Sequence, residues 1–205
     1  FRRLLFRSLQ DFEIALFDID HERLKDSEKM LNNIKKNQGS TVTIVSYTDR
    51  KDALRDAKYV LNAIQVGGYD PSTIIDFEIP KKYGLRQTIA DTVGIGGIFR
   101  SLRTIPVLMD FAKDMQEVCP DAWFLNYTNP MAALTGTMLR YTGIKTVGLC
   151  HSVQGCAEDL LKSLDMPTDN IQWEIAGINH VAWLLEINRN GEDLYPEIKR
   201  RALEK

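Results

Sequence analysis

Short apolar runs alternate with amphipathic stretches through the first 150 residues of the chain. Apolar runs of roughly four to eight residues between polar or glycine residues are typical of buried strands, and they lie at 13–20, 42–47, 59–66, 122–127 and 145–149. Apolar residues at helical spacing predict helices at 21–37, 51–57, 98–118 and 132–141. This order predicts an α/β fold, a doubly wound Rossmann-like parallel sheet with right-handed crossovers. Ligands bind such sheets at the carboxyl ends of the strands.

Two parts of the chain depart from this alternation. Glycines at 94, 96 and 97 follow a proline-containing stretch and predict a loop, while Pro106 should kink or delimit one turn of the helix over 98–118. After residue 150 the pattern becomes a helix at 153–164, strands at 171–175 and 181–187, and a turn at Asn190-Gly191. We therefore predict a dinucleotide-binding domain over 1–150 and the start of an α+β domain over 151–205. The first domain lacks its N-terminal strand and glycine loop, and we treat both chain ends as possible truncations.

Composition narrows the possible partners. The chain has 205 residues, of which 44% are hydrophobic and 26% charged, with a net charge of -2, so we expect a globular protein that attracts neither nucleic acid nor an anionic membrane. A small, near-neutral substrate is the expected ligand. Cys119, Cys150 and Cys156 form neither an even set nor a CxxC pair, which favours a reducing compartment, the cytoplasm. We expect five further side chains to pack in the core: Cys119, Cys156, Trp123, Trp173 and Trp183.

Polar side chains follow two of the predicted strands. Asp18 and Asp20 come after the first strand and before a helix, where a carboxylate can accept hydrogen bonds from the ribose hydroxyls of NAD. A helix N-cap is an equally good interpretation. Asn129 follows the strand at 122–127 and can hold a nicotinamide or a substrate hydroxyl, although an Asn-Pro pair is more often only a turn.

A cysteine and two histidines lie at strand ends further along the chain. Cys150 and His151 follow the strand at 145–149, and His180 lies about thirty residues on. Thiolate and imidazole are ligands for transition metals, so these side chains are a candidate metal site. The alternative is a buried cysteine with two hydrogen-bonded histidines. His21, the remaining histidine, is predicted to face solvent from a helix.

Six segments, taken together, resemble glycoside hydrolase family 4 in order and spacing: FDID (17–20), QVGGY (65–69), QTIADTVGIGG (87–97), LNYTNPMA (125–132), GLCHSVQG (148–155) and AGINH (176–180). Within the family, GLCHSVQG and TIADT resemble the α-galactosidase branch. The 6-phospho-glycosidase branch has Asp where this chain has His151, which argues against a phosphorylated substrate. The sugar follows from this branch resemblance alone, so α-glucosides and uronides stay open.

The resemblance implies hydrolysis by a route outside the usual two-carboxylate mechanism. NAD oxidises the sugar C3 hydroxyl, the acidified C2 proton is removed, the C1 leaving group is eliminated, water adds, and hydride returns to C3. A divalent metal, Mn2+ above others, polarises the sugar oxygens. The implied site residues are Cys150 and His180 for the metal, His151 as the acid, Asn129 and Asp91 for the sugar, and Asp18, Asp20, Gln65 and Gly67 for NAD.

The resemblance places the catalytic tyrosine base beyond residue 205, so we expect the 205-residue chain alone to be inactive. It also implies a homo-oligomer. Two other interpretations stay open at this point. A lactate- or malate-dehydrogenase-like oxidoreductase would share the sheet and the Asn-Pro pair and would accumulate NADH. A non-catalytic nucleotide-binding Rossmann module would have no use for a metal.

Overall fold

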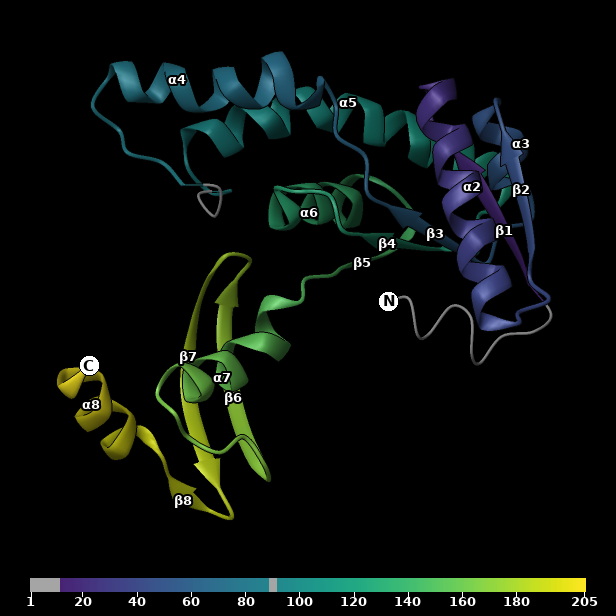
Figure 1. Ribbon diagram of the computed structural model, residues 1–205. Helices are drawn as coiled ribbons and strands as arrows, with labels where there is room; N and C mark the ends of the chain where they lie inside the picture. Colours follow the sequence, from purple (N-terminus) through teal and green to yellow (C-terminus); the bar gives the residue numbers. More distant parts are fainter. Residues whose placement is uncertain (1–11, 89–91) are drawn as a thin grey trace. The chain divides into compact units, whose positions relative to one another are not determined.

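The computed structural model describes residues 12–88 and 92–205 (Figure 1). In chain order its elements are β1 (Glu13–Phe17), α2 (His21–Gln38), β2 (Thr43–Tyr47), α3 (Arg50–Leu54), β3 (Tyr59–Asn62), the π-helical segment η1 (Gly68–Thr73), α4 (Ile74–Lys82), α5 (Ile95–Val118), β4 (Trp123–Asn126), α6 (Met131–Tyr141), β5 (Lys145–Gly148), α7 (Ser152–Ser163), β6 (Ile171–Ile178), β7 (Val181–Arg189), β8 (Glu192–Asp193) and α8 (Tyr195–Glu204). The strands and helices predicted from periodicity are all present, with ends that differ by a few residues.

The chain divides into two compact units. The first unit contains the chain up to Val60 together with Met109–Phe124 and Thr142–Lys145, and the second contains Leu61–Leu108, Leu125–Tyr141 and Thr146–Lys205. These units do not test the predicted domain boundary at residue 150, which stays a prediction.

In the first unit, β1 and β2 pair in parallel and α2 connects them. Helix α2 begins at Asp20, whose side chain accepts the N–H groups of Glu22 and Arg23, and it ends at Gly39, which has a φ of 60°. Glycine adopts this left-handed conformation without a Cβ penalty. The helix predicted over 21–37 is therefore present, and its last residue is Gln38, one residue later than predicted. His21 is exposed, as expected.

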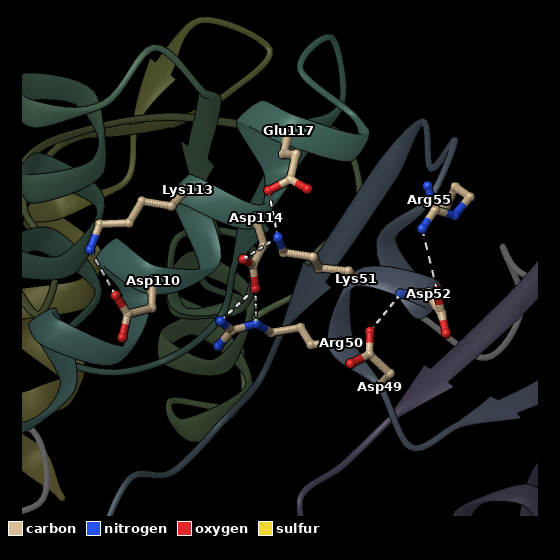
Figure 2. Close-up of polar contacts among 9 residues, drawn as sticks. All are labelled: Asp49, Arg50, Lys51, Asp52, Arg55, Asp110, Lys113, Asp114 and Glu117. Carbon is tan, nitrogen blue, oxygen red and sulfur yellow. Dashed lines mark hydrogen bonds and ion pairs between the residues drawn. The ribbon is translucent and has the colours of Figure 1, made fainter.

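Helix α3 is attached to the C-terminal half of α5 by ion pairs, which Figure 2 shows. Arg50 Nη2 lies 2.5 Å from Asp114 Oδ2, and Lys51 Nζ lies 2.5 Å from Glu117 Oε2. The Asp114 side chain is only 16% exposed, and the Arg50 guanidinium also stacks 4.4 Å above the ring centroid of Phe111. A charge pair that is partly shielded from water and packed on an aromatic ring is stronger than a surface pair. These contacts fix the connection between β2 and β3.

A second ladder has the strand order β3-β4-β5. The Trp123 N–H donates to the Lys58 carbonyl and the Tyr127 N–H donates to the Asn62 carbonyl. Because both partners advance in the same direction along the chain, β3 and β4 are parallel. The predicted parallel, Rossmann-like α/β class is therefore confirmed, with the parallel strands of the described residues paired in two ladders.

The glycine-rich stretch differs from its prediction. Gly96 and Gly97 lie in the first turn of α5, where a loop was expected, and Pro106 lies inside the same helix. A Cβ on Gly97 would lie 2.1 Å from the Thr92 carbonyl oxygen, and one on Gly96 would lie 2.5 Å from the Asp76 carbonyl oxygen. These glycines therefore permit close packing of the backbone, which a sequence pattern does not distinguish from a flexible loop.

The C-terminal strands β6, β7 and β8 form an antiparallel sheet in the second unit, as the change of pattern after residue 150 predicts. Asn190 and Gly191 make the turn with φ values of 52° and 85°, as expected for a tight hairpin. Helices α7 and α8 pack with the sheet around a buried cluster made of Ala157, Leu161, Leu164, Met166, Ile187, Leu194 and Ile198.

Some core predictions are wrong. Trp183 is 71% exposed, since Leu184 faces the buried cluster and adjacent strand residues point to opposite faces. Trp123 is 46% exposed beside the fully buried Phe124 for the same reason. Cys156 is exposed because α7 turns the adjacent Ala157 inward. In the described part of the chain, none of the helices has both the length and the apolar character needed to cross a membrane.

Candidate metal and substrate site

A buried polar network in the second unit orders the loops that follow β3 and β4. Asn62 Nδ2 donates to Asn126 Oδ1 (2.8 Å) and to Thr128 Oγ1 (3.1 Å). Asn126 is completely buried; its Oδ1 also accepts the Thr128 N–H, and its Nδ2 donates to the Thr128 carbonyl. Buried amides with most of their hydrogen bonds satisfied hold backbone firmly. The network therefore fixes the starts of the loops that carry Gln65 and Asn129.

Asn129 lies two residues before the start of α6, and one of its polar groups makes no hydrogen bond to another described residue. Its Oδ1 accepts the Met131 N–H at 3.3 Å, and its bond to Pro130 is cis. Among the described residues, its Nδ2 has no hydrogen-bond partner, and the residue is half-buried. Asn129 thus serves as a turn residue and still offers a donor to a ligand. Its role in substrate binding stays a prediction.

The loop after β3 holds two of the residues predicted to bind NAD. Gln65 Nε2 donates to Thr73 Oγ1 at 2.8 Å, which fastens the loop to η1. Gly67 has a φ of 84°, and a Cβ there would lie 2.2 Å from Ser72 Oγ. Only glycine fits this position without local rearrangement.

A buried ion pair supports the same loop. Asp76 is 4% exposed, and Arg103 grips both of its carboxylate oxygens, with Nη2–Oδ2 at 2.6 Å and Nη1–Oδ1 at 3.2 Å. Arg103 Nε also donates to the Val66 carbonyl at 3.1 Å. One guanidinium therefore links α4, α5 and the loop that contains Gln65 and Gly67. Sequence analysis missed this pair because the residues are distant in the chain.

The structure brings Cys150 and His180 together. Cys150 Sγ lies 3.6 Å from His180 Nε2, and the other ring nitrogen, Nδ1, lies 3.4 Å from Thr92 Oγ1. A metal-binding histidine usually has its second nitrogen hydrogen-bonded in this way, which orients the ring. Thr92 was not predicted, although it adjoins Asp91 in the QTIADTVGIGG segment.

The surroundings of Cys150 favour a thiolate. Burial alone would raise the pKa of the Cys150 thiol, but hydrogen bonds from the Ser152 hydroxyl and N–H, the Asn179 side chain and the His151 N–H outweigh it and lower the pKa. Asn179 Oδ1 is buried and has no hydrogen-bond partner among the residues that the structure describes. A thiolate, a neighbouring imidazole and an unsatisfied amide oxygen are a donor set suited to a cation.

These residues fit a divalent metal with an incomplete protein shell. Thiolate and imidazole bind a metal such as zinc at about 2.3 and 2.1 Å, so donors 3.6 Å apart can share one ion. Within residues 12–88 and 92–205, no three His, Cys, Asp or Glu side chains converge as metal ligands. The idea that both histidines converge on Cys150 is therefore wrong. His151 is exposed at the N-cap of α7, and its ring makes no hydrogen bond or ion pair with another described residue.

Asp18 and Asp20 have structural partners in the first unit. Asp20 is the N-cap of α2, while Asp18 accepts two hydrogen bonds of 2.6 Å from the Arg23 guanidinium. The hydrogen bond with Arg23 lowers the pKa of Asp18. The N-cap interpretation thus holds for Asp20, and a cofactor role for either carboxylate stays a prediction. Asp91, the remaining predicted sugar ligand, lies outside the described residues.

These features define a Rossmann-like α/β protein that carries a thiol–imidazole pair after a strand of its parallel sheet. The chain belongs to glycosyl hydrolase family 4. The model of family 4 glycosyl hydrolases matches residues 4–166, and the model of the C-terminal domain of the same family matches residues 175–205.

Individual relatives agree with this membership. The chain is 70% identical to an alpha-galactosidase of Bacillus subtilis (strain 168), covering 98% of the chain and 47% of that protein. It is 39% identical to an alpha-galactosidase of Rhizobium meliloti (strain 1021), over 89% of the chain and 37% of that protein. The chain thus spans less than half the length of these relatives.

Solved structures agree as well. A 6-phospho-alpha-glucosidase from gut microorganisms, in complex with NAD and Mn2+, superposes with a TM-score of 0.83 at 25% identity, covering 94% of this chain and 44% of that one. The 6-phospho-beta glucosidase of Thermotoga maritima with NAD and glucose-6-phosphate gives a TM-score of 0.79 at 25% identity, covering 94% and 46%.

Proposed function

We propose that the protein containing this chain hydrolyses α-galactosides with NAD and a divalent metal, most readily Mn2+. The observation that carries the proposal is the 70% identity with the Bacillus subtilis alpha-galactosidase, which extends over 98% of the chain. His151 supports an unphosphorylated sugar, because the phospho-glycosidase branch has Asp at the matching place. The solved relative that holds NAD and Mn2+ supports the choice of cofactors.

The chain supplies a residue for most roles in the reaction. Cys150 and His180 would hold the cation, and Asn129 would bind the sugar near C3 through its free Nδ2. His151 would protonate the departing oxygen, since an imidazolium can act as a general acid. Its ring is exposed and makes no hydrogen bond to another described residue, which leaves it accessible to a leaving group. When bound, NAD and the cation would supply transient oxidation at C3 and polarisation of the C2 and C3 oxygens.

The remaining assignments rest on the family resemblance. Asp91 would contact a second sugar hydroxyl, while Asp18, Asp20, Gln65 and Gly67 would contribute to NAD binding. All three cysteines are free thiols, which suits a reducing compartment. We propose a cytoplasmic homo-oligomer on this basis and on the resemblance.

The experiment that tests the function follows the sugar C2 hydrogen. The full-length protein, with NAD, Mn2+ and a reducing agent, turns over an aryl α-galactoside in heavy water, and NMR examines the released galactose. Deuterium at C2 is expected, since the proton there is removed and replaced from solvent. A reaction without NAD is the control and should release no galactose.

Other outcomes separate the competing functions. Net NADH without hydrolysis would replace the proposal with a dehydrogenase. Hydrolysis without deuterium at C2 would contradict the elimination route. Turnover of α-glucosides or uronides in place of α-galactosides would change the sugar. A protein that neither turns over glycosides nor binds a divalent metal would be a non-catalytic module.

A further inference from the structure

One half-buried cationic group in the second unit makes no hydrogen bond or ion pair with another described residue. Arg100, on α5, is half-buried and lines a small pocket. Among the described residues, its guanidinium makes no hydrogen bond or ion pair. Arg103, one turn further along the same helix, is fully engaged with Asp76 and the Val66 carbonyl. The two arginines therefore have different tasks.

The pocket has the chemistry of a site for an oxygen-rich neutral or anionic ligand. It is lined by Thr73, Asp76, Phe77, Gln87, Thr88, Thr92, Gly96, Gly97, Arg100 and Pro130. Asp76 is paired with Arg103, so Arg100 is the cationic side chain among the described lining residues that has no ion-pair partner. Gln87 accepts the Gly96 N–H through Oε1 at 3.1 Å, which directs its amide nitrogen elsewhere. Arg100 and the threonine hydroxyls supply hydrogen-bond donors to this lining, and Asp76 supplies acceptors.

Burial without a partner is unfavourable for a charged group. Removal from water lowers the pKa of the Arg100 guanidinium, and a buried charge normally has a counter-charge or several hydrogen bonds. The Asp76 carboxylate opposes this shift and raises the pKa of Arg100, but both of its oxygens are hydrogen-bonded by Arg103, and no described residue accepts a hydrogen bond from Arg100. A ligand that enters the pocket would supply the missing acceptors.

The pocket adjoins the thiol–imidazole pair. Thr92 lines the pocket, and its hydroxyl is the group that lies 3.4 Å from His180 Nδ1. Pro130 also lines the pocket, and it follows Asn129 directly in the sequence. A ligand held in the pocket would therefore lie close to the residues assigned to the metal and to the sugar.

We infer that Arg100 is a substrate-positioning residue that donates two hydrogen bonds to neighbouring hydroxyl oxygens of the glycoside. This inference rests on the proposed function. A planar guanidinium presents paired donors whose spacing suits two adjacent oxygens, whereas a lysine ammonium presents a point charge. Arg100 would thus orient the sugar ring relative to the Cys150–His180 pair.

The test compares Arg100→Met, which keeps the aliphatic stem, with Arg100→Lys and Arg100→Ala in the full-length protein. Steady-state kinetics with an aryl α-galactoside should show kcat/KM lower by roughly 10- to 100-fold in Arg100→Met, the usual effect of losing charged hydrogen bonds. Arg100→Lys should recover little, and added guanidinium ion should partly restore Arg100→Ala. Arg140→Ala, at an exposed arginine on α6, is the control and should match wild type.

A binding measurement accompanies the kinetics. Without NAD the protein cannot turn over, so NMR titration with methyl α-galactoside reports affinity alone, and the Kd should rise by a similar factor in Arg100→Met. A KM for NAD that rises while the sugar Kd is unchanged would assign Arg100 to the cofactor and overturn the inference. A KM and Kd within twofold of wild type would also overturn it.

Failure of the proposed function would give a different experimental result from failure of this inference. If the wild-type protein does not turn over α-galactosides, titration with methyl α-glucoside and galacturonate identifies the sugar it binds, and Arg100→Met must weaken that binding for the inference to hold. Circular dichroism of each variant separates lost binding from lost folding, and Arg100→Lys retains the charge if Arg100→Met does not fold.

Discussion

Replacing Arg103 by Met should loosen the second unit by a predictable amount. The change removes both hydrogen bonds to Asp76 and the one to the Val66 carbonyl. The Asp76 side chain is 6% exposed, so water cannot replace the guanidinium on the carboxylate. The variant leaves a buried carboxylate without its hydrogen-bonded counter-charge, and Arg100, the cationic neighbour that remains, makes no hydrogen bond to it.

The expected cost follows from the geometry. Breaking a buried pair by removing one partner costs about 3–5 kcal/mol, and we take the lower end, about 3 kcal/mol, because the Arg103 side chain is 27% exposed. The lost bond to Val66 adds about 1 kcal/mol. Neutralising the carboxylate as well, in Asp76→Asn/Arg103→Met, should reduce the total to about 1–2 kcal/mol, since no buried charge then remains.

Hydrogen exchange of the α4 backbone amides in the full-length protein measures this loss of stability locally. A local measurement is needed because the unfolding of a larger protein need not be two-state. About 3–4 kcal/mol corresponds to exchange roughly 100- to 1000-fold faster. Lys81→Met breaks an exposed pair with Glu78 on the same helix and should change exchange by less than about threefold. A change below tenfold in Arg103→Met, or a double variant as labile as the single one, would refute the reasoning.

Three further variants test the site and its support. Cys150→Ser should fold normally by circular dichroism yet lose Mn2+ binding in calorimetry, because a hydroxyl is a poor replacement for thiolate; unchanged affinity would remove Cys150 from the site. Thr92→Val removes the contact to His180 Nδ1 and should weaken Mn2+ binding about tenfold; an unchanged Kd would show that the hydroxyl does not orient the ring. Asn126→Ala, which leaves the buried Asn62 and Thr128 short of partners, should destabilise α6 by about 2–3 kcal/mol in hydrogen exchange; a loss under 1 kcal/mol would mean that the network is not structural.

Local patterns were enough to predict most of the fold. Helix α2 begins at Asp20 and ends at Gly39 because capping depends on the residues at the ends themselves. The start of α5 was mispredicted since Gly96 and Gly97 are required by neighbours distant in sequence, Asp76 and Thr92. A glycine in the sequence shows that the position has no side chain, and only the fold shows which neighbouring atoms require this.

The candidate site also has one part that the sequence predicts and another that only the structure shows. Cys150 lies after a parallel strand and His180 in a hairpin loop, positions at which functional side chains are expected from the order of elements alone, and the structure brings the two within 3.6 Å. The support for the site was not predictable. Asn62 and Asn126 are 64 residues apart, and nothing in either local pattern indicates that they meet.

Arg100 and Arg103 show where sequence reasoning about function stops. Both lie on α5, one turn apart, and no local pattern separates them. What separates them is Asp76, a residue on another helix: it lies near both arginines, but both of its oxygens are hydrogen-bonded by Arg103. Arg103 therefore holds the loop at Gly67, whereas Arg100 lines the pocket and makes no hydrogen bond or ion pair with another described residue. This difference arises only when α4 packs on α5, so the sequence alone does not show which of the two arginines is available to a ligand.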